Sequence, residues 1–131
     1  MSFPLLVRAV RLSLESVDRG LEAAARSRGL RVLVEVDVGM GRAGVAPGQP
    51  SVELARQVHE TPGLRLRGLM AWEGHARGEP DLEGRKPVIE EAIGLLVSSA
   101  EQCRAAGLPV NIISAGGTGT FYVTAFQPGI T

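Results

Sequence analysis

An alternation of strand-like and helix-like segments constrains the fold of this chain more than any other feature of its sequence. Residues 31–38 carry β-branched valines at every second position, which predicts a strand. Residues 64–72 and 110–114 are two further apolar segments of strand length. A helix-like segment separates each strand from the next, and such crossovers join parallel strands. The pattern therefore predicts an α/β domain with parallel strands, compatible with a doubly wound sheet or a (β/α) barrel.

Apolar periodicity and end signals predict the helices of this domain. We expect them over residues 17–29, 51–60, 82–106 and 118–125. Gly29 suits the end of the first helix, and Ser51 is a plausible N-cap for the second. Cys103 lies in the apolar stripe of the longest helix, which indicates packing in a reducing compartment.

Composition and length exclude several classes of protein and suggest one domain over residues 1–131. The chain has 14 Lys and Arg against 14 Asp and Glu, so its charge favours neither nucleic acid nor an anionic membrane. It contains no apolar stretch of the roughly 20 residues that cross a bilayer, and we expect a cytoplasmic protein. Three or four β/α units are too few to close a barrel of eight. We therefore expect a fragment of a longer enzyme.

The octet "SAGGTGTF", residues 114–121, follows the last predicted strand. Its glycines let backbone N–H groups converge on one point, and a helix beginning near Thr118 would direct its positive end there. This pattern predicts a phosphate cradle, whose residues are Ser114, Gly116, Gly117, Thr118, Gly119 and Thr120. A strand-to-helix turn without any ligand is the alternative. The octet matches neither the dinucleotide fingerprint nor the nucleotide-binding loop.

The segment "DVGMGRAG", residues 37–44, follows the first predicted strand. Arg42 stands between glycines, and its rigid, permanently charged fork suits an oxygen anion or a phenolate. A solvated arginine on a flexible loop is the alternative. Asp37 could pair with Arg42 and fix its direction.

The segment "AWEGHA", residues 71–76, follows the second predicted strand. Trp72 and His75 could stack on a planar ring, and His75 could exchange protons near neutral pH. As the sole tryptophan on an apolar strand, Trp72 is more often a core residue, and this interpretation is favoured. His59 is expected to be exposed on its helix. One cysteine and two distant histidines give no metal-ligand spacing.

Together with "PGIT" near the end, the segments "VLVEVDVGMGRAGV", "GLMAWEGH" and "SAGGTGTF" resemble the D-threonine aldolase branch of the alanine-racemase-like enzymes. The resemblance covers about residues 15–131. It implies the fold-type III architecture, a (β/α)8 TIM-type barrel that binds pyridoxal 5′-phosphate and precedes a β-rich domain. This chain would then be a partial barrel that lacks the first strand or strands and the C-terminal β domain.

The resemblance also implies roles for individual residues. Arg42 would reach the ring oxygen of the cofactor, and Trp72 and His75 would line its ring, with His75 the candidate catalytic residue. The phosphate would be surrounded by Ser114, Gly116, Gly117, Thr118 and Gly119. The implied reaction cleaves small D-β-hydroxy-α-amino acids to glycine and an aldehyde. A D-serine dehydratase, an amino-acid racemase relative, a non-catalytic cofactor-binding module and an unrelated barrel for a phosphorylated metabolite are the alternatives.

The sequence departs from this family at one essential position. These enzymes hold the cofactor as a Schiff base on a lysine near the N-terminus, whereas the sole lysine here, Lys86, lies in a polar stretch at the start of the longest helix. We expect Lys86 to be exposed and the chain alone to be inactive. The family's divalent metal (Mn, Mg or Zn) binds in the C-terminal domain, and the full-length protein would form a homodimer.

Overall fold

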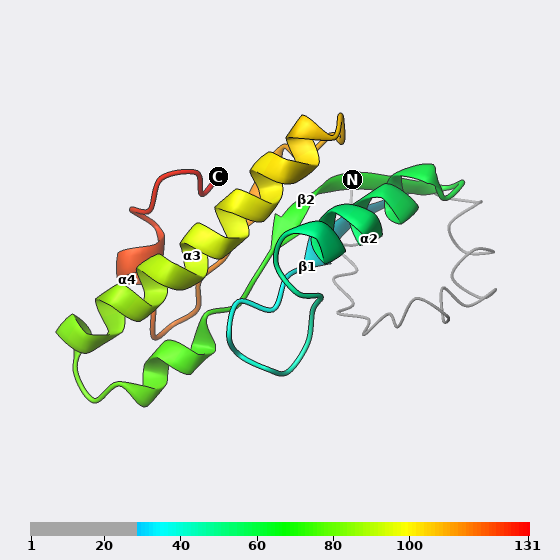
Figure 1. Ribbon diagram of the computed structural model, residues 1–131. Helices are drawn as coiled ribbons and strands as arrows, with labels where there is room; N and C mark the ends of the chain where they lie inside the picture. Colours follow the sequence, from blue (N-terminus) through cyan, green and yellow to red (C-terminus); the bar gives the residue numbers. More distant parts are fainter. Residues whose placement is uncertain (1–28) are drawn as a thin grey trace, which may run out of the picture.

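The computed structural model describes residues 29–131, in which strands and helices alternate along the chain (Figure 1). The elements are β1 (Leu30–Glu35), α2 (Gln49–Glu60), β2 (Leu64–Met70), the 3₁₀ helix η1 (Gly74–Gly78), α3 (Leu82–Ala105), β3 (Ile112–Ser114) and α4 (Phe121–Thr124). The helix predicted over residues 17–29 lies, apart from its last residue, outside the described residues. None of the helices in residues 29–131 is long and apolar enough to cross a membrane.

The three strands form one parallel sheet in the order β1-β2-β3. Val34 of β1 is in register with Leu69 of β2, which is in register with Ile113 of β3, and all three are buried. The predicted parallel strands are confirmed, although each strand is shorter than predicted. β1 ends early because the amide of Asp37 donates to the Val45 carbonyl of the following loop, 2.8 Å away, rather than to β2.

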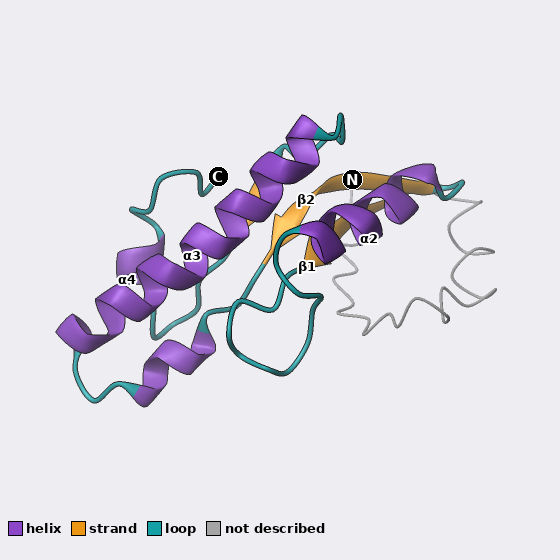
Figure 2. Cartoon of the chain, viewed as in Figure 1, coloured by secondary structure: helices purple, strands orange, loops and turns teal. Residues whose placement is uncertain are grey.

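Helices α2 and α3 lie side by side over one face of the sheet (Figure 2). The main hydrophobic core lies between this face and the helices. Cys103 of α3 is fully buried in it, as its place in the apolar stripe predicted, and burial raises the pKa of its thiol. Since side chains alternate along a strand, Glu35, Met70 and Ser114 lie on the opposite face, where they are half-buried.

The start of α2 corrects one prediction about its cap. Gly48, not Ser51, occupies the N-cap position, and its φ of 79° favours glycine. Ser51 lies within the first turn, where its buried hydroxyl donates to the Ala46 carbonyl at 2.8 Å. The serine therefore ties the helix to the preceding loop instead of capping the helix.

Helix α3 begins as a capped helix should. Asp81 is its N-cap, and one of its carboxylate oxygens accepts a hydrogen bond of 2.7 Å from the amide of Gly84. The helix ends at Ala105, one residue before the predicted end, and Gly107 follows with a φ of 79°. A second, smaller core cluster of Ala76, Ile89 and Ile93 packs η1 against α3. This packing fixes η1 at the end of the sheet.

Candidate functional site

The three polar segments singled out in the sequence gather at one edge of the sheet (Figure 1). They are the loop of residues 36–48 after β1, which we call the first loop, the helix η1 after β2, and residues 115–120 after β3, which we call the glycine turn. Parallel strands present all their carboxyl ends at one edge, which explains why segments far apart in the sequence meet here.

The loop after β1 is closed by backbone hydrogen bonds at its base. The amide of Val45 donates to the Glu35 carbonyl at 3.0 Å, beside the bond from Asp37 to Val45. Gly44 adopts a φ of 100°, and a Cβ there would lie 2.7 Å from the Asp37 nitrogen. Only glycine fits this close approach, so the loop returns to the strand in a defined conformation.

Asp37 is engaged by the loop itself. Its Oδ1 accepts hydrogen bonds from the amides of Gly41 at 3.0 Å and Gly39 at 3.1 Å. The Gly41 amide contributes most to lowering the pKa of Asp37, against an opposing effect of burial, and the nearby His75 lowers it further. The structure thus assigns Asp37 to holding the loop, not to the predicted pairing with Arg42.

Arg42 lies instead over the indole of Trp72, with its Cζ 4.4 Å from the ring centroid. The indole approaches two glycines closely along its Nε1–Cζ2 edge, so that a Cβ at Gly74 would lie 2.5 Å from Cζ2 and a Cβ at Gly117 2.7 Å from Nε1. Trp72 is half-buried and belongs to neither core cluster, so the favoured interpretation of a core residue was wrong. The indole joins the first loop to the glycine turn.

A hollow of about 560 Å³ opens beside this indole. It is lined by Trp72, Arg77, Arg85, Gly117, Thr118, Gly119 and Thr120. The amides of Thr118 and Gly119 make no hydrogen bond to any other residue in the described part of the chain. Arg85 donates from Nε to the Glu79 carbonyl at 3.0 Å. The N–H groups of its two terminal nitrogens therefore remain available to bind a ligand. The hollow therefore combines two cations, two backbone donors and an aromatic wall, which suits an anionic group on a planar ring.

Two other amides of the glycine turn, those of Gly116 and Gly117, donate hydrogen bonds within the protein. The amide of Gly117 donates to Oγ1 of the buried Thr120 at 3.0 Å, and the amide of Gly116 donates to Oε2 of Glu73 at 3.2 Å. α4 begins at Phe121, not at the predicted residue 118, and is a single turn. The helix starts late because the amides of both Thr120 and Phe121 donate to the Gly117 carbonyl, which makes residues 117–120 a turn.

Three residues of this site were not found from the sequence, namely Glu73, Arg77 and Arg85. Glu73 is fully buried, and its second oxygen, Oε1, accepts from the hydroxyl of Thr124. A charged residue between Trp72 and Gly74 at the end of an apolar strand was the available signal. The arginines follow the motifs by a few residues on η1 and α3, and no local pattern distinguishes them from solvated side chains.

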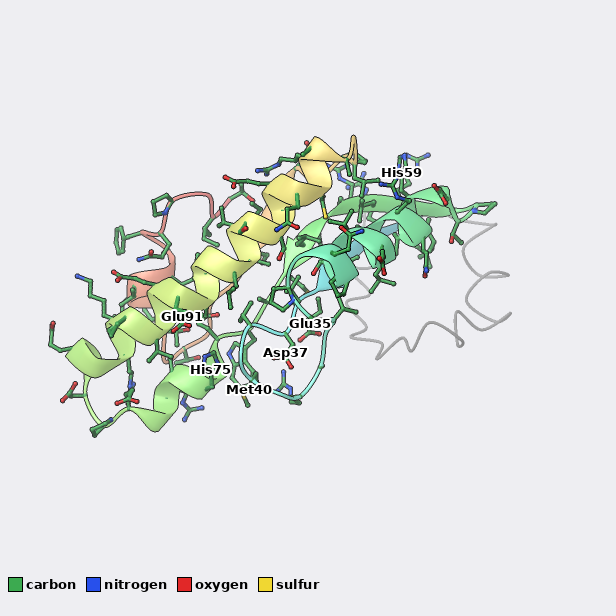
Figure 3. The ribbon with its side chains drawn as sticks, viewed as in Figure 1. Glu35, Asp37, Met40, His59, His75 and Glu91 are labelled. Carbon is green, nitrogen blue, oxygen red and sulfur yellow. The ribbon has the colours of Figure 1, made fainter. Side chains whose placement is uncertain are left out.

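His75 lies on η1 near the first loop rather than in the hollow (Figure 3). A Cβ at Gly39 would lie 2.8 Å from its Nε2, so the ring rests against that glycine. Its Nδ1 is buried and has no hydrogen-bond partner among residues 29–131. Asp37 and Met40 lie at the same end of the molecule, whereas His59 is exposed at the opposite end. The structure separates the two histidines, as expected.

The residues Ser114, Gly116 and Lys86 do not line the hollow. Ser114 ends β3 in register with Met70, and Gly116 adopts a φ of 104° at the start of the glycine turn. Lys86 is exposed on α3, as expected. Within residues 29–131, no group of three His, Cys, Asp or Glu side chains is placed to hold a metal ion.

Comparison with known proteins relates this chain to a family, to curated proteins and to solved structures. The family model described as alanine racemase, N-terminal domain, matches residues 7–130. The 3-hydroxy-D-aspartate aldolase of Paracoccus denitrificans (strain Pd 1222) is 35% identical over 104 residues, which cover 78% of this chain and 27% of that protein. The structure of D-threonine aldolase from Filomicrobium marinum is 33% identical with a TM-score of 0.71 and is matched over 79% of this chain and 28% of that one.

D-threo-3-hydroxyaspartate dehydratase from Delftia sp. HT23 is 28% identical with a TM-score of 0.74 and is matched over 85% of this chain and 30% of that one. The chain thus spans less than a third of the length of the relatives it matches. These likenesses and the three parallel strands confirm the predicted fold class, part of a (β/α)8 TIM-type barrel.

Proposed function

Because the chain belongs to the family of alanine racemase N-terminal domains, we propose that it binds pyridoxal 5′-phosphate at the edge of the sheet where the glycine turn lies. The resemblance to the D-threonine aldolase branch of alanine-racemase-like enzymes is confirmed by the same comparisons. The relatives named aldolase or dehydratase are lyases, and this chain shares their fold over most of its described residues.

The observation that carries the proposal is the convergence of an anion site and an aromatic wall in one hollow. The free amides of Thr118 and Gly119 and the side chains of Arg77 and Arg85 suit a phosphate dianion. The indole of Trp72 forms the adjoining wall and suits a planar ring. The residues present therefore fit a phosphorylated aromatic group, and when bound this group would supply an electron sink for a carbanion.

We assign the remaining roles to the two segments next to Trp72. Arg42 already lies against the indole, and its guanidinium would bind the ring oxygen from that position. His75 carries a buried, unpartnered Nδ1 among the described residues and would hold or transfer a proton there. The lowered pKa of Asp37 keeps its carboxylate charged close to that histidine.

The whole protein that contains this chain would be a lyase acting on small D-β-hydroxy-α-amino acids, cleaving them to glycine and an aldehyde. Its aldolase relatives support this reaction. Dehydration of the same class of substrate is the second candidate, because the dehydratase structure matches a larger share of this chain, 85% against 79%. Release of glycine from D-threonine or 3-hydroxy-D-aspartate supports the first reaction, and release of ammonia with a 2-oxo acid supports the second.

Binding can be tested directly because Trp72 is the only tryptophan of the chain. We expect pyridoxal 5′-phosphate to quench its emission and pyridoxal to bind more weakly. A charge-assisted hydrogen bond contributes about 1.5–3 kcal/mol, so Arg77→Ala and Arg85→Ala should each weaken binding by about 10- to 100-fold. Arg56→Ala, at an exposed position on α2, is the matched control. Equal Kd values for all four proteins would refute the assignment of the phosphate to this hollow.

A further inference from the structure

Glu73 joins two parts of the chain that carry the proposed site, although it does not line the hollow. Both its oxygens accept hydrogen bonds, Oε2 from the Gly116 amide and Oε1 from the Thr124 hydroxyl. These partners lie 43 and 51 residues away in the sequence, one in the glycine turn and the other at the end of α4. The side chain is fully buried, so water does not compete for these bonds.

We propose that Glu73 is a positioning residue, whose buried carboxylate holds the glycine turn in the conformation that binds phosphate. The inference rests on the proposed function, since it concerns the same hollow. It assigns to Glu73 no contact with the ligand. A carboxylate in contact with the ligand would repel a phosphate dianion. The carboxylate of Glu73 instead holds the backbone that forms the wall of the hollow.

The hydrogen bonds around the turn explain why both ends need to be held. Gly116 adopts a φ of 104°, and its amide has Glu73 as its acceptor. At the other end, the amide and hydroxyl of Thr124 donate to the Thr120 carbonyl at 3.1 and 3.2 Å. Thr120 in turn accepts from the Gly117 amide. Glu73 thus completes a network of hydrogen bonds around residues 116–124. The amides of Thr118 and Gly119 take no part in this network.

The position of Glu73 also couples the turn to the aromatic wall. Trp72 precedes Glu73 in the chain, and the indole rests against Gly117. The same short segment therefore places the ring on one side of the hollow and holds the turn that forms the other side. Loss of the carboxylate would leave the Gly116 amide without an acceptor in a part-buried site, and the turn would rearrange to satisfy it.

Three substitutions separate positioning from charge. In Glu73→Gln, the carbonyl can accept from Gly116 while the amide donates to the Thr124 hydroxyl, which keeps its own bond to Thr120. We expect this variant to bind pyridoxal 5′-phosphate within about threefold of the wild type and Glu73→Ala to bind at least about tenfold more weakly, the loss of one net hydrogen bond or more. Thr124→Val, which retains the Gly116 bond, should lie between them, and Thr124→Ser should match the wild type. Glu53→Gln, on the exposed face of α2, is the matched control for loss of charge.

Hydrogen exchange of single amides in the ligand-free chain provides a second measurement that does not need the ligand. We expect the Gly116 amide to exchange at least about tenfold faster in Glu73→Ala, in line with the loss of one hydrogen bond. The exchange rate of the Gly84 amide, which donates to the Asp81 carboxylate, should be unchanged. If the wild type fails to bind pyridoxal 5′-phosphate but Gly116 shows this change, the proposed function fails and the holding of the turn by Glu73 stands. Unchanged exchange at Gly116, or a Glu73→Gln variant as impaired as Glu73→Ala, would overturn the positioning role.

Discussion

Replacing Gly117 by alanine introduces a methyl carbon 2.7 Å from Nε1 and 3.4 Å from Cδ1 of Trp72. Non-bonded carbon atoms prefer separations of about 3.5–4.0 Å, so the two groups must move apart by roughly 1 Å. The indole has little room to withdraw, because its adjoining atoms Cζ2 and Cη2 rest against Gly74 and the guanidinium of Arg42 lies over its face. We expect the ring to turn into the hollow, where space is available.

The cost of this overlap can be estimated from overpacked sites in other proteins. Inserting one methylene where there is no room costs about 1–3 kcal/mol, which corresponds to about a five- to 150-fold change in an equilibrium constant. Trp72 is only half-buried, so most of this cost should appear in ligand binding and little in the free energy of unfolding. The backbone adds no strain, because Gly117 is not among the glycines with positive φ.

The assay is a fluorescence titration of the 131-residue chain with pyridoxal 5′-phosphate, combined with a thermal melt. Gly78→Ala is the matched control, since a Cβ at this neighbouring site on η1 would meet nothing within 4 Å. We expect Gly117→Ala to shift the emission of Trp72 and weaken binding, and Gly78→Ala to do neither. An unshifted emission and an unchanged Kd in Gly117→Ala would refute the close packing of the indole on the glycine turn.

Three further predictions concern the pH dependence of the first loop and the packing of α3. The lowered pKa of Asp37 adds stability that is present above its unfolded pKa of about 3.9 and is lost as the pH falls through the folded value. A carboxyl titration by NMR should place the folded value below 3.8, and a value at or above 3.8 would contradict the hydrogen bonds to the loop. The buried Cys103 thiol, whose pKa is raised, should react with a thiol reagent slowly in the native protein and fast in urea, and equal rates would contradict its burial. Gly94→Ala, at an exposed site where a Cβ meets nothing within 4 Å, should stabilise α3 by about 0.5–1 kcal/mol in urea unfolding, and a loss of stability would argue against a helix there.

Much of the fold could be predicted because burial imposes regular patterns on the sequence. The alternating valines of β1 and the apolar stripe of α3 both follow from packing one face against a core. The ends of elements were less predictable, because they depend on particular hydrogen bonds. Serine is a residue type that often caps helices, yet the hydroxyl of Ser51 donates to the Ala46 carbonyl outside the helix. α4 begins late because residues 117–120 form a turn of their own.

The candidate site could be predicted as a set of segments but not as a network. Glycines and polar residues directly after apolar strands marked each segment, and the parallel sheet brought them to one edge. The partners within the site are distant in sequence, such as Glu73 and Thr124, which are 51 residues apart. No local pattern records such a contact. The sequence also did not indicate which amides of the glycine turn are available to a ligand. The amides of Gly116 and Gly117 donate within the protein, whereas those of Thr118 and Gly119 do not.

Binding of a phosphorylated ring in the hollow beside Trp72 can be observed in amide and indole N–H shifts during a two-dimensional NMR titration. On addition of pyridoxal 5′-phosphate, we expect the largest shifts at the amides of Thr118 and Gly119 and at the indole N–H of Trp72. Inorganic phosphate should move the two amides and leave the indole nearly in place. Shifts centred on the opposite end of the sheet, around His59, or no saturable shift at Thr118 and Gly119, would contradict binding in this hollow.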